Sequence, residues 1–356
     1  MRILFVSKYV DHILYFCLRE LAEKSELSIV YELESDWTAR LAVSNARVTQ
    51  ITAKSRFDRS FQSRIEELWI NANWDIVQSF HGNAQLANLL HWNKRKLPIV
   101  GYRAYIGHLK LRENPWAYWS VRSPKLAVVA AVSAAVKDYL DSFWLLKPKN
   151  TRVISHGVNR EWIASQCGEP FGLRAKLGLD EDTFVVASMA SLRPYKHFEV
   201  VAEAAKQLRS HPIHFVHVGN PKGWDERTRD IENIHFLGHQ TRPFAIISEA
   251  DVFATTCDNE AFGRSNLEAM ALGKPLIGSS TGGLLDLIDE GMTGRFFKTR
   301  DAADFARQVS AYYEDRSLVD EHRANALRHI DERFSSKRMA ENYLKLYEDA
   351  LSGSIG

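Results

Sequence analysis

The sequence predicts an α/β protein built from two doubly wound, mostly parallel sheets. The chain has 356 residues, which is long for one hydrophobic core and sufficient for two domains. Short apolar runs alternate with helical patterns in both halves, as expected for parallel strands covered by helices. The alternation breaks around residues 167–172, where glycine and proline indicate a linker. Together these observations predict two Rossmann-like domains that face each other across a cleft.

In the first half, short runs of branched and aromatic residues predict seven strands. Helical periodicity predicts four helices between them. The strands are expected at 3–6, 28–31, 48–51, 76–79, 99–102, 127–132 and 153–155, and the helices at 11–24, 60–69, 84–92 and 133–142.

The second half repeats the pattern with six strands. A helical pattern at 335–351 closes the chain. The strands are expected at 184–189, 214–218, 234–237, 252–254, 276–278 and 294–297.

Composition indicates an ordinary globular protein of a reducing compartment. Hydrophobic residues make up 45% of the chain and charged residues 25%. The apolar run at the start is cut short by polar residues at 7–9, so it reads as a buried strand rather than a signal sequence. Cys17, Cys167 and Cys257 show no ligand or disulfide spacing. A cytoplasmic location is therefore expected.

Charge is distributed unevenly, although the net charge is only +2. Residues 1–165 contain 23 Lys and Arg against 15 Asp and Glu, which leaves the remainder acidic. A basic surface beside aromatic rings suits an anionic membrane, so peripheral association is one interpretation and a solvated face is the other. No nucleic acid is expected, since no reader motif accompanies the charge. The residues concerned are Arg40, Arg47, Lys54, Arg56, Arg59, Arg64, Lys94, Arg95, Lys96, Lys110 and Arg112, with Trp116, Tyr118 and Trp119.

The most informative segment is 260–283, which reads EAFGRSNLEAMALGKPLIGSSTGG. Its first residues form the turn that joins a predicted strand to a predicted helix. Gly263 leaves space for a ligand, and the N–H groups of Gly263, Arg264 and Ser265 lie at a helix start, where sugar or phosphate oxygens bind. Glu260 and Glu268 provide carboxylates that accept hydrogen bonds from sugar hydroxyls. The alternative is an exposed acid on a surface helix with a capping glycine.

This segment resembles the signature of the retaining glycosyltransferases called glycosyl transferases group 1, whose members share E-x-F-G-x-x-x-x-E, then A-M-A-x-G-x-P-x-I and G-G. The resemblance implies that Glu260 contacts the donor sugar, that the turn from Phe262 to Ser265 contacts sugar and phosphate, and that Glu268 holds the ribose. Asp286 stands where the family usually has glutamate.

The resemblance also implies a GT-B fold and its division into parts. Residues 1–165 would form the acceptor-side domain and 172–334 the nucleotide-sugar domain. The final segment, 335–356, would cross back to the first domain.

A second motif, MASLRPYKH at 189–197, follows the first strand of the second domain. Arg193 and Lys196 leave the carboxyl end of that strand, where parallel sheets bind ligands, and two cations there would stabilise a departing diphosphate. The stretch resembles the family's G-R-L-x-P-x-K-G loop, except that Ala190 and Ser191 replace Gly-Arg, so Arg193 would substitute. The alternative is a surface loop with incidental charges.

The first domain is less informative. His81 and Arg103, together with His108, follow predicted strands at the expected cleft. The family often keeps a histidine near the position of His81, offset here by one residue. For His81 and Arg103, a sugar or acceptor role and a loop-packing role both remain open.

Neither a metal nor a cofactor is expected. The acidic string at 180–182 matches the D-x-D pattern that binds metal in other glycosyltransferases, but it lies in a polar turn. His211, His214 and His217 have a spacing that places neighbours on opposite faces of a strand.

The resemblance implies a metal-independent, retaining hexosyltransferase that uses a UDP- or GDP-type sugar and a glycan or lipid-linked acceptor. Its place would be bacterial-type polysaccharide, lipopolysaccharide or glycoconjugate synthesis. A dehydrogenase is disfavoured, because the first strand lacks the glycines that admit a pyrophosphate. A nucleotide-sugar epimerase or phosphorylase of the same fold remains an alternative, as does a non-catalytic carbohydrate-binding protein.

Overall fold

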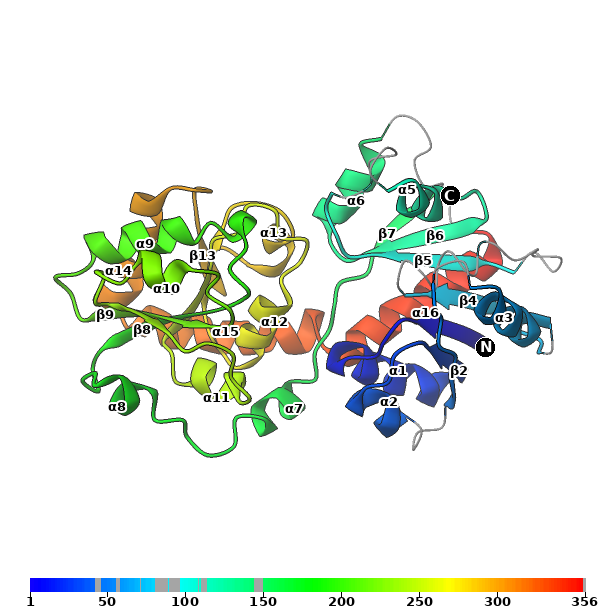
Figure 1. The fold of residues 1–356 in the computed structure, drawn as a ribbon, viewed down its shortest axis with the longest axis horizontal. Coiled ribbons are helices and arrows are strands. Elements are labelled where there is room, and N and C mark those ends of the chain that lie inside the picture. The colour runs from blue at the N-terminus through cyan, green and yellow to red at the C-terminus, as the bar shows by residue number, and fades with distance from the viewer. Residues whose placement is uncertain are drawn as a thin grey trace. The chain divides into compact units, whose positions relative to one another are not determined.

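The computed structural model describes residues 1–41, 46–55, 58–70, 72–80, 89, 97–107, 109, 114–143 and 150–354. The chain divides into two compact units, Met1–Gly157 with Ser336–Gly356, and Val158–Ser335. In Figure 1 the first unit runs from blue to teal and ends in red, and the second runs from green to orange. This division falls at Gly157, several residues before the expected boundary at 165.

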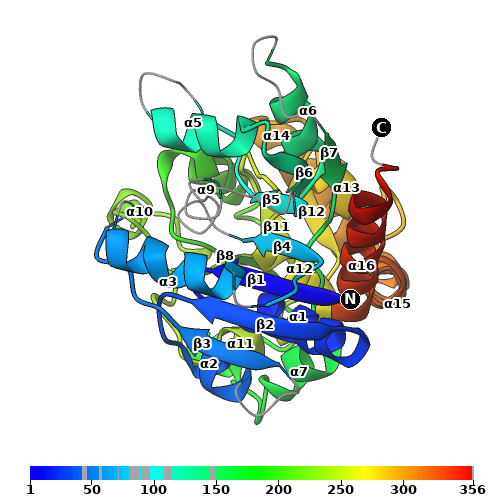
Figure 2. The same cartoon turned by 90° about the vertical axis from the view of Figure 1, so that its right-hand side faces the viewer.

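The first unit is built on a seven-stranded sheet in the order β3-β2-β1-β4-β5-β6-β7, and Figure 2 shows these strands side by side. All neighbouring strands run parallel. The strand order reverses between β1 and β4, which is a topological switch point. The strands are β1 (Arg2–Ser7), β2 (Glu26–Tyr31), β3 (Arg47–Gln50), β4 (Ile76–Ser79), β5 (Ile99–Arg103), β6 (Leu126–Ala131) and β7 (Thr151–Val153).

The C-terminal helix belongs to this first unit. Helix α16 (Ser336–Ser352) packs beside α1 (His12–Lys24), and its Tyr343 and Tyr347 are buried. The N–H of Leu14 in α1 donates to the Asp11 side chain at 2.9 Å, which caps the helix start. The other described helices of the unit are α2 (Asp36–Leu41), α3 (Arg59–Ile70), α5 (Pro115–Arg122) and α6 (Ala134–Asp141).

The second unit is built on a six-stranded parallel sheet in the order β10-β9-β8-β11-β12-β13. Its switch point lies between β8 and β11. The strands are β8 (Phe184–Met189), β9 (Ile213–Val218), β10 (Ile234–Phe236), β11 (Val252–Thr255), β12 (Leu276–Ser279) and β13 (Gly294–Phe297).

Ten helical segments accompany this sheet. Helices α9 and α14 pack against each other, and Figure 1 shows them on one side of the sheet with α11 on the other. The segments are α7 (Arg160–Ser165), α8 (Leu173–Leu177), the 3-10 helix η1 (Pro194–Lys196), α9 (Phe198–Gln207), α10 (Trp224–Arg227), α11 (Pro243–Ser248), α12 (Arg264–Ala271), α13 (Leu284–Leu287), α14 (Ala302–Glu314) and α15 (Ser317–Arg333).

One buried lysine ties α11 to the sheet. The ammonium of Lys274 donates to the carbonyls of Ser248 and Ala250, both at 2.7 Å, and the side chain is buried. Burial lowers the pKa of Lys274 from 10.5 to about 8, because the charged form is less well solvated than in water.

All thirteen predicted strands are present, so the predicted fold class is confirmed. The largest shift is at β7, which was expected at 153–155 and occupies Thr151–Val153. The helix expected at 84–92 lies outside the described residues, apart from Leu89. Within the described part of the chain, no helix is long and apolar enough to span a membrane.

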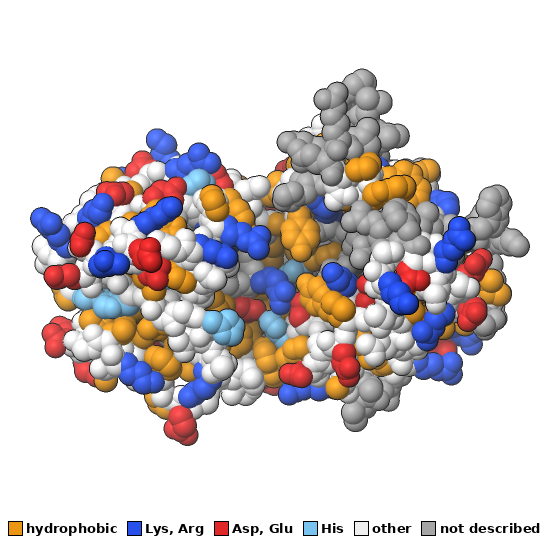
Figure 3. Space-filling model, viewed as in Figure 1, with side chains coloured by type: hydrophobic (Ala, Val, Ile, Leu, Met, Phe, Trp, Pro, Cys, Tyr) orange, Lys and Arg blue, Asp and Glu red, His pale blue; other side chains and the backbone are white. Residues whose placement is uncertain are grey.

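Charges are interspersed on the second unit. Figure 3 shows Lys and Arg side chains alternating with Asp and Glu over the visible face of this unit. In the first unit several predicted basic positions, namely Arg56, Lys94, Arg95, Lys96, Lys110 and Arg112, lie outside the described residues.

Candidate active site

The loops after β8 and β11 meet at the switch point of the second sheet. These two strands are parallel neighbours, so their carboxyl ends open on the same edge. The loop after β8 carries Lys196, and the loop after β11 carries Glu260. The strand order therefore brings two motifs together that lie 64 residues apart in the sequence.

Lys196 and Glu260 form an ion pair at this edge. The Lys196 Nζ to Glu260 Oε2 distance is 2.7 Å, and the side chains are only 19% and 17% exposed. Burial is the largest single effect on the pKa of Lys196 and lowers it, but the charge and hydrogen bond of Glu260, together with Cys257 and Tyr195, raise the pKa above its usual value. The Thr256 hydroxyl also donates to the Lys196 carbonyl oxygen at 2.6 Å. The lysine is thus charged and fixed at both its backbone and its ammonium group.

The start of α12 has no side-chain cap. Gly263 precedes the helix at φ 89°, a left-handed conformation that favours glycine, and its carbonyl accepts from the N–H groups of Asn266 and Leu267. A Cβ on Gly263 would lie 2.2 Å from Asn266 Nδ2 and 3.3 Å from Glu260 Cγ. The turn therefore needs glycine for its conformation, and an added Cβ would also force the Asn266 side chain to shift.

Asn266 was not predicted as a site residue. It is 1% exposed, and its side-chain oxygen and nitrogen find no hydrogen-bond partner among the described residues. A buried amide without partners is costly, because its oxygen and nitrogen lose their hydrogen bonds to water. The sequence offered no signal for it, because asparagine at the third residue of a helix is usually exposed.

Gly282 and Gly283 pack against the backbone of the Glu260 turn. A Cβ on Gly282 would lie 2.4 Å from the Glu260 carbonyl oxygen, and one on Gly283 would lie 2.2 Å from that of Ala261. The N–H of Gly283 donates to the Glu260 carbonyl oxygen at 2.8 Å. The glycine pair in the sequence pattern is explained by this close backbone contact.

The remaining predicted donor residues lie in and around α12. Phe262 is buried, and its ring lies 5.7 Å from that of Phe334. Glu268 is also buried, at 6% exposed, one turn into the helix. Arg264 and Ser265, at the helix start, are half-buried.

Arg193 is placed differently from Lys196. It immediately precedes η1, and its side chain is exposed. Lys196 is the cation paired with Glu260, whereas Arg193 stands at the solvent side of the same loop.

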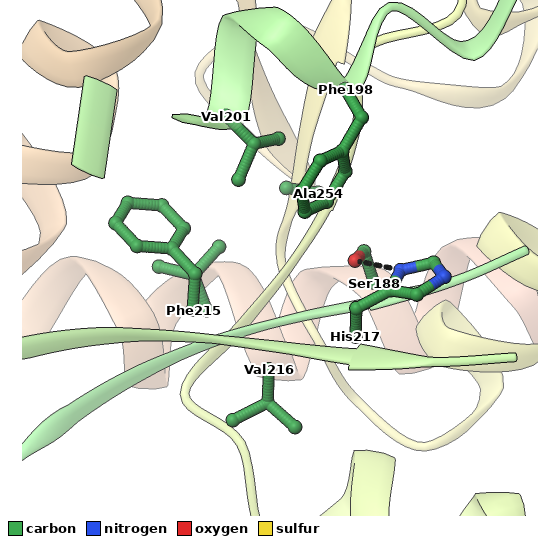
Figure 4. Close-up of a pocket in the computed structure, with 8 residues that line it drawn as sticks. Ser188, Phe198, Val201, Phe215, Val216, His217 and Ala254 are labelled. Carbon is green, nitrogen blue, oxygen red and sulfur yellow. Dashed lines mark hydrogen bonds between the residues drawn. The ribbon is translucent and has the colours of Figure 1, made fainter. Parts of the chain in front are cut away.

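A buried histidine braces the end of β8. Figure 4 shows Ser188 and His217 pointing toward each other across the two strands, with a 2.8 Å distance from the Ser188 hydroxyl to His217 Nδ1. His217 Nε2 lies 3.0 Å from the Ala190 carbonyl oxygen, so it donates and Nδ1 accepts from Ser188. Burial lowers the pKa of His217 from 6.5 to about 4, which keeps the ring neutral. The small cavity behind it is lined mainly by apolar side chains, including Phe198 and Val201.

The residues predicted in the first unit are only partly described. Arg103 ends β5, and its guanidinium donates to the carbonyl of Tyr105 at 2.9 Å and to that of Gly107. Burial lowers the pKa of Arg103. His81 and His108, which were also expected near the cleft, lie outside the described residues.

The predicted metal-like patterns have ordinary surroundings. Residues 180–182 are exposed in a turn before β8. His214 Nδ1 lies 2.8 Å from His235 Nε2, and His217 faces Ser188 instead. Among the residues that the structure describes, no group of three His, Cys, Asp or Glu could hold a metal ion.

Two doubly wound parallel sheets in separate units define a GT-B type of α/β protein. Residues 172–329 match the family model described as "Glycosyl transferases group 1", and residues 18–162 match "Glycosyltransferase Family 4". The chain belongs to the group 1 glycosyltransferases and is a sugar-transferring enzyme.

The curated relatives are named for different sugar-transfer reactions. D-inositol 3-phosphate glycosyltransferase 1 of Catenulispora acidiphila is 24% identical over 314 residues, which cover 80% of this chain and 74% of that protein. N-acetyl-alpha-D-glucosaminyl L-malate synthase of Bacillus anthracis is 26% identical over 186 residues, covering 50% of this chain. That match spans about half of the relative, 49% of its length.

Solved structures share the fold over nearly the whole chain. HepE of Anabaena in complex with UDP has a TM-score of 0.77 at 18% identity, covering 98% of this chain and 100% of that one. WaaG, a glycosyltransferase of lipopolysaccharide biosynthesis, has a TM-score of 0.67 at 14% identity, covering 97% and 99%.

Proposed function

We propose that the chain is a retaining, metal-independent hexosyltransferase that moves a sugar from a UDP- or GDP-type donor to a hydroxyl of a glycan, glycolipid or other acceptor. The observation that carries this proposal is the Lys196–Glu260 ion pair at the switch point, beside the uncapped start of α12. HepE structures that contain UDP and UDP-glucose support this class of donor.

The ion pair provides one group for each half of the donor. On donor binding, the ammonium of Lys196 would turn to the diphosphate, and the carboxylate of Glu260 would accept hydrogen bonds from the sugar. Arg193, exposed on the same loop, would supply a second cation. The two charges of the pair thus balance each other until a ligand takes over both partners.

Helix α12 would hold the rest of the donor. The turn from Phe262 through Gly263 and Arg264 to Ser265 would bind sugar and phosphate oxygens through backbone N–H groups and the helix dipole. The buried Glu268 would accept from the ribose hydroxyls.

The reaction would depend mainly on electrostatic stabilisation. The bond from the anomeric carbon to the phosphate oxygen breaks while the acceptor oxygen bonds to the same face of that carbon. The acceptor proton passes to the departing phosphate. Lys196 and the start of α12 would stabilise the charge that develops on the diphosphate.

A panel of nucleotide sugars tests the donor class. A specific donor should raise the unfolding temperature, because it binds only the folded chain. Glu260→Ala should abolish transfer but leave the fold intact, with Glu232→Ala, an exposed acid of the same unit, as the control. Normal turnover by the Glu260 variant would contradict the assigned role.

Lys196→Ala tests the phosphate contact. It should weaken binding of UDP or GDP much more than binding of uridine or guanosine, whereas Lys222→Ala, an exposed control, should change neither. Equal losses for nucleotide and nucleoside would contradict the assignment.

Two assays test the stereochemistry and the metal independence of the reaction. If the transfer retains configuration, NMR of the product should show the anomeric configuration of the donor. If no metal is needed, the enzyme should keep full activity in EDTA.

Cytoplasmic location with peripheral membrane association is part of the proposal. Trp116 and Trp119 are exposed on α5, 43% and 37% respectively, in the basic half of the chain. Aromatic rings of this kind insert at a membrane interface. The chain should float with phosphatidylglycerol vesicles but not with phosphatidylcholine vesicles. The double variant Trp116→Ala, Trp119→Ala should not float with phosphatidylglycerol vesicles. Flotation of that variant would exclude α5 as the contact.

For Arg103 and His81, the proposal remains a sugar or acceptor contact, and Arg103→Ala should raise the acceptor KM more than the donor KM. An unchanged acceptor KM would contradict an acceptor contact by Arg103 and would leave it a packing role through its bonds to the loop carbonyls.

A further inference from the structure

A buried amide lies beside the Lys196–Glu260 pair without a hydrogen bond of its own. The Asn266 side chain is 1% exposed, and neither of its polar atoms has a partner among the residues that the structure describes. Leucine has the same branched shape and no polar atoms, so it would fill this position without the desolvation penalty. The stability that an asparagine costs here is therefore expected to be recovered in another state of the protein.

The amide of Asn266 lies against Gly263 and the stem of Glu260. A Cβ built on Gly263 would be 2.2 Å from Asn266 Nδ2 and 3.3 Å from Glu260 Cγ, so the amide and the glutamate flank the same point. The backbone of Asn266 is fixed there, because its N–H donates to the Gly263 carbonyl at 3.0 Å. The first turn of α12 thus places two side-chain N–H donors next to the glutamate of the ion pair.

The Glu260 carboxylate depends on one cation. Within the described part of the chain, its only hydrogen bond or ion pair is the one that Oε2 forms with the Lys196 ammonium at 2.7 Å. The Glu260 side chain is 17% exposed, so water solvates it only in part. When the ammonium turns to a diphosphate, a largely buried carboxylate loses its partner. Such a loss is costly, because the remaining charge is left unpaired.

We propose that Asn266 is the positioning residue that takes over the Glu260 carboxylate when Lys196 turns to the donor diphosphate. The inference rests on the proposed function, since it assigns Lys196 to the diphosphate and Glu260 to the donor sugar. The two side chains already flank the same point, so rotations about their own bonds bring an amide N–H to the carboxylate. Asn266 does not touch the donor. It keeps Glu260 paired and directed at the sugar hydroxyls.

A neutral amide suits this exchange of partners. An ammonium attracts a carboxylate more strongly than an amide does, because it adds a full charge to the hydrogen bond. Lys196 therefore holds Glu260 before the donor binds, as in the structure, and Asn266 holds it only after the ammonium has left. A second cation in place of Asn266 would keep Glu260 permanently and leave it less able to accept from the sugar.

Calorimetric binding of UDP-glucose and GDP-mannose tests the proposal, with the tighter of the two as the probe. Asn266→Leu should raise its Kd by about tenfold, as expected for loss of one hydrogen bond to a charged group. Without ligand, this variant should unfold at a higher urea concentration than the wild type, because the amide has no hydrogen bond to lose among the described residues. Unchanged donor binding, or unfolding at lower urea, would overturn the proposal.

Two variants control for the change in packing. Asn266→Ala also lacks the donor but adds no bulk beside Gly263, so it should raise Kd as much as Asn266→Leu does; wild-type affinity would contradict the proposal. Asn233→Leu removes another buried asparagine, which precedes β10 at the amino ends of the strands, opposite the site. There Nδ2 donates to the carbonyls of Ala205 and Ile213 at 3.0 and 3.1 Å. This control should lower stability and leave the donor Kd unchanged.

A double-mutant cycle with Glu260→Gln tests whether Asn266 acts through Glu260. UDP and GDP are the probes, because they carry the diphosphate without a sugar and do not need the Glu260 contact. Asn266→Leu should raise their Kd by about tenfold in the wild type, but by less than about twofold in the Glu260→Gln background, where no carboxylate is left to take over. Equal losses in both backgrounds would show an effect on packing alone and would exclude the positioning role.

The amide protons of Asn266 report the exchange directly. Their 15N-edited NMR signals, assigned by their loss in Asn266→Leu, should move downfield when the tighter nucleotide sugar is added, as a hydrogen bond to a carboxylate forms. The Asn233 amide should not move. Donor binding without a shift at Asn266 would refute this inference and leave the proposed function intact. No binding of any nucleotide sugar would remove the proposed function and this inference with it.

Discussion

Replacing Gly283 with alanine is expected to damage both stability and donor binding, because a methyl group has no space there. The added Cβ would lie 2.2 Å from the Ala261 carbonyl oxygen and 2.7 Å from Phe262 Cα. The oxygen would have to retreat by about 1.2 Å to reach the 3.4 Å at which ordinary contact begins. Both obstacles are backbone atoms, so no side-chain rotation relieves the clash.

The cost can be worked from the contacts that must change. Separating the two segments breaks the hydrogen bond from the Gly283 N–H to the Glu260 carbonyl, which contributes about 1 kcal/mol. Overpacking of a tight contact costs about 1 to 3 kcal/mol more. Gly283 has φ −71°, so no backbone strain is added. We expect a loss of about 2 to 4 kcal/mol in the free energy of unfolding.

Urea unfolding and donor binding measure the two effects, and Gly291→Ala is the matched control. Gly291 lies in the same unit at φ 72° with nothing within 4 Å of an added methyl, so its variant should lose only about 1 kcal/mol and keep donor binding. The donor affinity of Gly283→Ala should fall, since Glu260 and the α12 start are displaced. A Gly283 variant as stable as the control, with normal binding, would refute the close-contact reasoning.

Three further variants test individual buried groups. Burial lowers the pKa of His217 to about 4, against 6.5 in the unfolded chain, so unfolding between these pH values takes up a proton. When the pH falls from 6.5 to 4, the free energy of unfolding of the wild type should therefore drop by about 3 kcal/mol relative to that of His217→Asn, as measured by urea unfolding. Burial likewise lowers the pKa of Lys274 to about 8, against 10.5 in the unfolded chain, so unfolding again takes up a proton. From pH 8 to 10.5 the free energy of unfolding of the wild type should rise by about 3 kcal/mol relative to that of Lys274→Met; stability profiles that run parallel with pH would contradict the shift. Asn266→Leu removes a buried amide without partners among the described residues and should raise the free energy of unfolding by about 1 to 3 kcal/mol; a fall would show that the amide is satisfied.

Much of the fold follows from local sequence patterns. Buried parallel strands are short apolar runs, and this signal located β4, β8 and β13 at their observed bounds. Strand β7 lies two residues earlier than expected, because the apolar pair Val153 and Ile154 marks its end and not its start; the Ile154 N–H still donates to the Ala131 carbonyl at the end of β6, at 2.8 Å. Strand order was not visible in the sequence, since it depends on packing between residues far apart along the chain.

The candidate site was predictable in its parts and not in its connections. The sequence placed Glu260 and Lys196 at strand ends, but their 2.7 Å ion pair depends on β8 lying beside β11. The bonds of His197 to Glu199 and Asp258 were missed for a related reason. The glycine that the loop pattern G-R-L-x-P-x-K-G has at the position of His197 was the one sign of its left-handed backbone. The carboxylate at Asp258 comes from a distant segment, so the contact with it had no local signal.

The first compact unit is assembled from both ends of the polypeptide. Helix α16, with Tyr343 and Tyr347 fully enclosed, packs beside α1 more than 300 residues earlier in the chain. On a ribosome that releases the N-terminus first, Val158–Ser335 can complete its own core before α16 emerges. The N-terminal strands must then wait for the last helix to be made. Truncations that end before Ser336 should therefore yield a chain whose continuous half is native-like and whose split half is open to proteolysis.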